Sequence, residues 1–138
     1  MLILVSVTNF TSSKLQTSNS IEGTWELVNR FNYDSGSVSD TLLNANGYRQ
    51  IKIYSKDKVM WTRYSPDDPA EWFGYGRYAT TETSLEEQLE YGSDAMMKVI
   101  DTTDVFRFEL HLYKDAYSQI TLDDEGNPTF AENYKRID

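Results

Sequence analysis

The stretch Gly23-Thr24-Trp25-Glu26-Leu27-Val28 opens the folded part of the chain, and Tyr134-Lys135-Arg136-Ile137 closes it. The segments between these two stretches alternate in polarity, are rich in aromatic residues and include no convincing long helix. Alternation with a period of two is typical of strands that bury one face. Such short strands indicate an all-β sandwich or barrel, and the two end stretches favour an antiparallel up-and-down barrel of about eight strands whose last strand returns beside its first.

Turn-forming residues separate the predicted strands. Asp34-Ser35-Gly36-Ser37 ends the first strand, and Asn46-Gly47 is a strong turn signal because both residues tolerate positive φ. Between these two turns, residues 37–46 are predicted to form a helical turn or a lid loop. Residues 85–89 have helix-forming side chains but also alternate cleanly, which favours a strand. The strands are predicted at residues 22–33, 48–54, 59–64, 72–80, 84–91, 95–100, 105–113, 117–122 and 129–137.

The composition limits the possible functions. At 138 residues the chain is long enough for one hydrophobic core and too short for two ordinary domains. It has 13 Lys and Arg against 22 Asp and Glu, a net charge of −9. Such an acidic surface repels nucleic-acid phosphates and anionic lipid headgroups, so we expect neither nucleic-acid nor direct membrane-surface binding. Because the chain has no Cys, disulfides, thiol catalysis and Cys-ligated zinc are excluded.

The first twenty residues differ in composition from the rest. Residues 1–7 are apolar, but they are too few for a membrane span and lack the flanking features of a signal peptide. Residues 8–20 are rich in Ser, Thr and Asn, as in a flexible leader. We therefore expect residues 1–20 to be a leader or the remnant of an export or anchor segment, and residues 21–138 to be the barrel domain. The leader favours a location outside the cytoplasm, either periplasmic or secreted.

Several motifs resemble, in their order and spacing, those of the bacterial lipocalin-like domains of the calycin superfamily. They are Gly23-Thr24-Trp25, Val59-Met60-Trp61-Thr62-Arg63-Tyr64, Phe73-Gly74-Tyr75-Gly76-Arg77-Tyr78, Glu87-Gln88-Leu89-Glu90-Tyr91 and Tyr134-Lys135-Arg136. The resemblance extends over nearly all of the chain after Ile21. It implies that Trp25 closes the barrel floor under Arg136, and a guanidinium stacked on a Trp face suits a dry end. It also implies an open opposite end that takes an apolar or aromatic molecule.

A cluster of aromatic and arginine side chains is the strongest candidate for a ligand site. Aromatic rings with interspersed guanidinium groups suit a planar or carboxylate-bearing ligand. Strand alternation prevents all of them from pointing inward, so we expect Trp61, Tyr75 and one arginine to reach the cavity or its rim. The alternative is that these rings fill a closed core. The predicted ligand-binding residues are Trp61, Arg63, Tyr75, Arg77, Tyr91 and His111.

His111 is the only histidine, so a His-rich metal site cannot form and a Ser-His-Asp arrangement would depend on it alone. It alternates against Phe108, Leu110 and Leu112, which places it outside the barrel unless the lumen is polar. In that case His111 would line the interior with Arg107 and Glu109. We assign no catalytic residue, metal ligand or cofactor. The glutamates between residues 82 and 90 fit a solvated face better than the paired carboxylates of a glycosidase.

The sequence therefore favours a protein that binds a small hydrophobic or aromatic molecule in its barrel without transforming it. Two other functions remain open. One is an isomerase or hydrolase that uses a carboxylate or His111 inside the barrel, which requires a titratable group with a shifted pKa in the cavity. The other is a protein-interaction domain whose barrel is filled by its own side chains and whose surface carries an exposed apolar patch. Nothing in the sequence identifies a protein partner.

Overall fold

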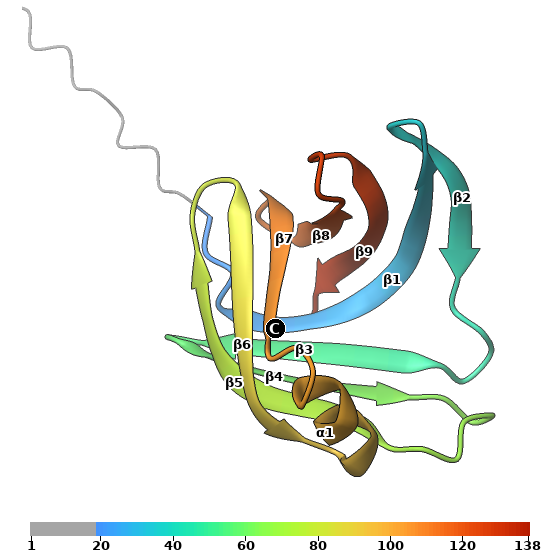
Figure 1. Cartoon of the computed structure of the whole chain (residues 1–138), viewed down its shortest axis with the longest axis vertical. Coiled ribbons are helices and arrows are strands. Elements are labelled where there is room, and N and C mark those ends of the chain that lie inside the picture. The colour runs from blue at the N-terminus through green and yellow to red at the C-terminus, as the bar shows by residue number, and fades with distance from the viewer. Residues whose placement is uncertain (1–18) are drawn as a thin grey trace, which may run out of the picture.

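The computed structural model describes residues 19–138, and the predicted leader lies almost entirely outside this range. The described chain forms nine strands and one short helix (Figure 1). The elements are β1 (Gly23–Asp34), β2 (Ser37–Leu43), β3 (Arg49–Ser55), β4 (Lys58–Tyr64), β5 (Trp72–Thr80), β6 (Ser84–Gly92), α1 (Asp94–Ile100), β7 (Val105–Leu112), β8 (Ala116–Leu122) and β9 (Pro128–Arg136).

All strand pairs are antiparallel, and the sheet closes into a ring because β1 pairs with β9. Residues 23–26 of β1 pair with β3, while residues 29–34 pair with β2. Every strand except β2 therefore belongs to the ring. β2 forms a hairpin with the second half of β1 and lies beside it (Figure 1). This arrangement confirms the predicted antiparallel barrel, in which the last strand returns beside the first.

β2 replaces the helical turn or lid loop that the sequence predicted for residues 37–46, so that prediction was wrong. Ser35 and Gly36 both have positive φ, 51° and 84°, as a two-residue hairpin turn of type I′ requires. The turn sends the chain back along β1 from Ser37. All seven residues of β2 are exposed, so this strand has no buried face to give an alternating signal.

Residues 95–100 form part of helix α1 and not the predicted strand. The Ser93 side chain accepts a hydrogen bond from the Met96 N–H at 3.4 Å, which caps the helix. Asp94 in the first turn and Lys98 in the last turn complement the helix dipole. With these end signals, the local helix preference overrides a short apparent alternation. In the described residues no helix is long and apolar enough to cross a membrane.

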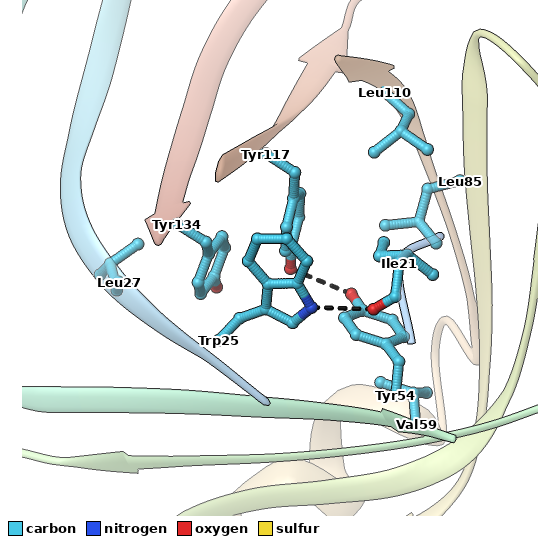
Figure 2. Close-up of a cluster of buried hydrophobic side chains, with 9 residues drawn as sticks. All are labelled: Ile21, Trp25, Leu27, Tyr54, Val59, Leu85, Leu110, Tyr117 and Tyr134. Atoms are coloured by element: carbon cyan, nitrogen blue, oxygen red, sulfur yellow. Dashed lines mark hydrogen bonds between the residues drawn. The ribbon is translucent and has the colours of Figure 1, made fainter. Parts of the chain in front are cut away.

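An aromatic floor closes one end of the barrel (Figure 2). The Trp25 indole is fully buried, donates a hydrogen bond to the Ile21 carbonyl at 2.8 Å and packs edge-on against Tyr117. Tyr117 in turn stacks on Tyr134, with ring centroids 4.8 Å apart. Tyr54 and Tyr117 share a hydrogen bond of 3.1 Å. Each of these rings is at most 2% exposed, so together they fill the interior at this end of the barrel.

Arg136 packs on this floor at the position that the sequence analysis assigned to it. Its guanidinium carbon lies 4.2 Å from the centre of the Trp25 ring system. Its three nitrogens donate to the carbonyl oxygens of Ser20, Glu22 and Lys114. One side chain thus ties the last strand to the segment before β1 and to the β7–β8 turn.

Candidate functional site

Above the aromatic floor, the inner face of β3 is polar. Gln50, Lys52 and Tyr54 occupy successive inward positions and are each at most 3% exposed. Burying a charge or an amide is unfavourable unless its hydrogen bonds are satisfied. The neighbouring strands supply the partners in two layers.

The deeper layer is centred on Lys52. Its ammonium lies 2.6 Å from Glu87 Oε2 on β6 and 2.8 Å from Gln119 Oε1 on β8. The Tyr54 hydroxyl donates to the same Glu87 oxygen at 2.7 Å. Lys52 and Glu87 therefore form a buried ion pair whose geometry is fixed by three different strands.

The upper layer is centred on Gln50. Its Oε1 accepts hydrogen bonds from Tyr48, from Arg30 and from Arg63 Nε, the last two at 3.0 Å. Its Nε2 donates to Glu132 Oε2 and to the Tyr134 hydroxyl, both at 2.7 Å. Through this amide, groups from β1, β4 and β9 are held in one arrangement.

The two layers belong to one network. Gln119 accepts from Lys52 below and donates through Nε2 to Glu132 Oε1 above, at 3.1 Å. Glu132 also lies 3.6 Å from Arg30 Nε. The charged groups inside the barrel are thus linked by amides, which hold their positions before any ligand enters.

Burial also determines the state of the interior tyrosines. It raises the pKa of Tyr54, Tyr117 and Tyr134 well above the usual tyrosine value. The negative charge of Glu87 raises the pKa of Tyr54 and Tyr117 further, and that of Glu132 does the same for Tyr134. All three hydroxyls are therefore neutral and able to donate hydrogen bonds to the carboxylates and amides around them.

Beside this network lies a cavity of about 130 Å³. Its polar wall is the network itself, and its apolar wall comes from β4, β6, α1 and β7. The polar lining consists of Gln50, Lys52, Arg63, Glu87, Gln119, Glu132 and Tyr134. The apolar lining consists of Trp61, Leu89, Met96, Phe106 and Phe108. The interior is therefore amphipathic and partly hollow.

Arg63 and Glu132 mark the way out of the cavity, because they also line a wider depression at the barrel mouth. Arg30, Tyr48 and Phe130 form other parts of that depression. A molecule entering from the mouth would meet the arginine side chains before reaching the Lys52–Glu87 pair.

Two glycines of β5 allow groups of the neighbouring strands to approach its backbone closely. Gly74 lies directly opposite Trp61, and a Cβ at Gly74 would lie 2.9 Å from the indole nitrogen. A Cβ at Gly76 would lie 2.0 Å from the Gln88 carbonyl oxygen, beside a register shift between β5 and β6. The missing side chain at Gly74 therefore leaves the space in which the Trp61 ring lies.

The structure brings two of the six predicted ligand-binding residues to the cavity. Trp61 and Arg63 both line it, and the Arg63 guanidinium carbon lies 5.9 Å from the ring centres of both Trp61 and Trp72. The pairing of an aromatic ring with a guanidinium, expected from the sequence, is thus present on the inner face of β4.

The other four lie on the outer face. Tyr75 packs on Tyr91 across the β5–β6 pair, with ring centroids 5.4 Å apart. Arg77 pairs with Glu90 at 3.3 Å, and His111 lies 3.7 Å from Glu109 on the exposed side of β7. The structure does not place these side chains with Trp61 and Arg63.

The sequence analysis missed most of the polar wall. Glu87 has the same strand phase as Leu85 and Leu89, which are buried, and Glu132 has that of Tyr134. A polar residue in phase with buried apolar ones was the available signal. On β3 the pattern is reversed, because Ile53 lies outside and Lys52 inside, so alternation there pointed the wrong way.

Comparison with known proteins finds one similar fold and identifies no activity. No family model matches the chain, and no curated protein is similar to it. A crystal structure of an uncharacterized protein from Bacteroides eggerthii DSM 20697 superposes with a TM-score of 0.53 at 12% identity. The match covers 83% of this chain and 98% of that one. Fold and site together define the class as an antiparallel β-barrel with a polar-walled interior cavity.

Proposed function

We propose that this protein binds a small molecule, about one ring in size, in its barrel and releases it unchanged. The observation that carries the proposal is the amphipathic cavity of about 130 Å³. A buried cavity of about 150 Å³ admits benzene, whereas pockets for drug-sized ligands measure about 300–1,000 Å³. The volume therefore favours a single aromatic or aliphatic ring over haem or a long fatty acid.

The arrangement of the walls supports binding. Hydrogen bonds among Gln50, Lys52, Gln119 and Glu132 already hold the polar wall in place, so the ligand need not reorder it, and little side-chain entropy is lost on association. On the opposite wall, Phe106 and Phe108 supply the apolar surface that favours transfer of a ring from water. Trp61 lines the same space and serves as an optical reporter of occupancy.

Titration of Trp fluorescence with a panel of single-ring compounds, haem and fatty acids tests the proposal, with native mass spectrometry to weigh the bound species. We expect saturable quenching by single-ring compounds only and recovery of unchanged ligand. Leu89→Phe should abolish binding by filling the cavity, whereas the same substitution at Leu43, which is 78% exposed, should have no effect. Failure of every single-ring compound to bind would refute the proposal.

A further inference from the structure

The charges inside the barrel do not balance. Lys52 pairs with Glu87 at 2.6 Å, and Arg30 pairs with Glu132 at 3.6 Å. Arg63 lines the same cavity, yet no carboxylate within residues 19–138 forms an ion pair with it. Asp68, at the exposed rim of the mouth, accepts hydrogen bonds from Trp72 Nε1 and Ala70 N instead. Three cations and two carboxylates leave one positive charge without a partner.

Arg63 is held in a position to use that charge. Its Nε donates to Gln50 Oε1 at 3.0 Å, and its guanidinium lies close to the rings of Trp61 and Trp72. Its two terminal nitrogens donate to no other side chain or carbonyl in the described part of the protein. A planar guanidinium with two free N–H groups on one edge matches the two oxygens of a carboxylate.

A second free group lies deeper in the cavity. Glu87 is 4% exposed and lines the cavity, and its Oε2 accepts the hydrogen bonds of both Lys52 and Tyr54. No described residue donates to its other oxygen, Oε1. Among the described residues only Asn44 Oδ1 is a fully buried side-chain atom without a hydrogen-bond partner, so Glu87 Oε1 is reached from the cavity, where a ligand or a water donates to it. The cavity therefore offers an acceptor as well as a cation.

The two free groups lie at different depths. Arg63 lies opposite Gln50 in the β3–β4 register, whereas Glu87 binds Lys52, the next inward residue of β3. One inward step spans two residues, about 7 Å along a strand. Phe106 lies opposite Glu87 in the β6–β7 register, Leu89 is the next inward residue of β6 toward the mouth, and both line the cavity. A ring with one substituent toward the mouth and another toward the floor fits this geometry.

Resting on the proposed function, we infer that the ligand is a monocyclic carboxylic acid that carries a hydroxyl group. Its carboxylate binds the terminal N–H groups of Arg63 at the mouth, its ring packs on Phe106 and Leu89, and its hydroxyl donates to Glu87 Oε1. The ligand's single negative charge neutralises the unpaired guanidinium as water leaves the site. A cationic ligand would add to that charge, and a neutral one would leave it unpaired.

The test is calorimetric titration of the full chain with 4-hydroxybenzoate, 3-hydroxybenzoate, benzoate and 4-hydroxybenzyl alcohol. We expect one of the hydroxybenzoates to bind at least tenfold more tightly than the neutral alcohol, and severalfold more tightly than benzoate. Arg63→Met should remove the preference for the acid over the alcohol. Arg77→Met, which changes an arginine on the outer face, should keep it.

The outcomes separate the two proposals. If the alcohol binds as tightly as the acids, the inferred carboxylate is wrong while the proposed single-ring site stands. If benzoate equals both hydroxybenzoates, the assignment to Glu87 is overturned. If no compound of the series binds, the inferred hydroxy acid is overturned, and the wider panel of single-ring compounds decides the proposed function. The comparison among ligands uses the unaltered protein, so it decides the matter even if Arg63→Met fails to fold.

Discussion

At the scale of single residues, the position of the Trp61 ring depends on Gly74. A methyl group at position 74 would lie 2.9 Å from the indole nitrogen, so Gly74→Ala should displace the ring into the cavity. We expect a loss of about 1–3 kcal/mol in the free energy of unfolding, as in other overpacked cores, together with weaker binding of single-ring compounds. Urea denaturation and ligand titration measure the two effects.

Gly126→Ala is the matched control for this substitution. A Cβ there meets nothing within 4 Å, but the φ of +83° is unfavourable for alanine. This variant should lose about 1 kcal/mol and bind ligands normally. Equal binding by both variants would show that the missing side chain at Gly74 does not determine the space available to a ligand.

The interior charges show what strand alternation can and cannot reveal about single residues. Trp61 and Arg63 were predictable because an aromatic ring and a cation share one face of β4. Glu87 was assigned to a solvated face, although it lies in phase with Leu85 and Leu89. Its burial is explained by its ion pair with Lys52, which lies 35 residues away in the sequence. Local patterns contain no information about such long-range pairs.

At the scale of elements, helix α1 forms part of the cavity wall through Met96. The Ser93 hydroxyl caps this helix and also accepts a hydrogen bond from the Phe73 N–H at 3.2 Å. We expect Ser93→Ala to destabilise the protein by about 1 kcal/mol. Amide hydrogen exchange should become faster in α1, and binding of single-ring compounds should weaken. Ser39→Ala, on the exposed strand β2, is the control and should change neither.

Elements with a buried face were predicted within a few residues of their observed bounds, and the two wrong predictions have local physical causes. β2 has no buried side, so only the Ser35-Gly36 turn could have indicated it. Residues 95–100 are too few for period two to be distinguished from a helical turn. The sequence signal for the helix was Ser93 as its N-cap, followed by Asp94 in the first turn, and the apparent alternation led to a strand prediction instead.

At the scale of the whole molecule, Arg136 joins the last strand to the segment just before β1, under the barrel. Its hydrogen bonds to the carbonyls of Ser20, Glu22 and Lys114 are made by a charged donor. Arg136→Ala should therefore lower the free energy of unfolding by at least about 2 kcal/mol. Arg136→Lys should recover only part of it, because an ammonium cannot reproduce the planar fork.

The control for the barrel floor is Lys135→Ala, an exposed neighbour on the same strand. Urea midpoints should separate the Arg136 variants from it, while single-ring binding at 25 °C should be unchanged in all of them because neither Arg136 nor Lys135 lines the cavity. A similar midpoint for the Lys135 and Arg136 alanine variants would contradict a structural role for the stack on Trp25.

Buried tyrosines make the stability of the whole barrel sensitive to alkaline pH. The pKa values of Tyr54, Tyr117 and Tyr134 are raised in the folded chain, whereas in the unfolded chain tyrosine titrates near pH 10. Above about pH 10 the unfolded state therefore binds fewer protons than the folded state, so stability is fully present below that pH and falls as the pH rises.

Tyrosinate absorbance at 295 nm, followed with circular dichroism, should show at least three of the ten tyrosines ionising only as the barrel unfolds. Tyr134→Phe should make the loss of stability with pH less steep, unlike Tyr113→Phe at an exposed position. Ionisation of all ten tyrosines near pH 10 with the fold intact would contradict the closed aromatic floor.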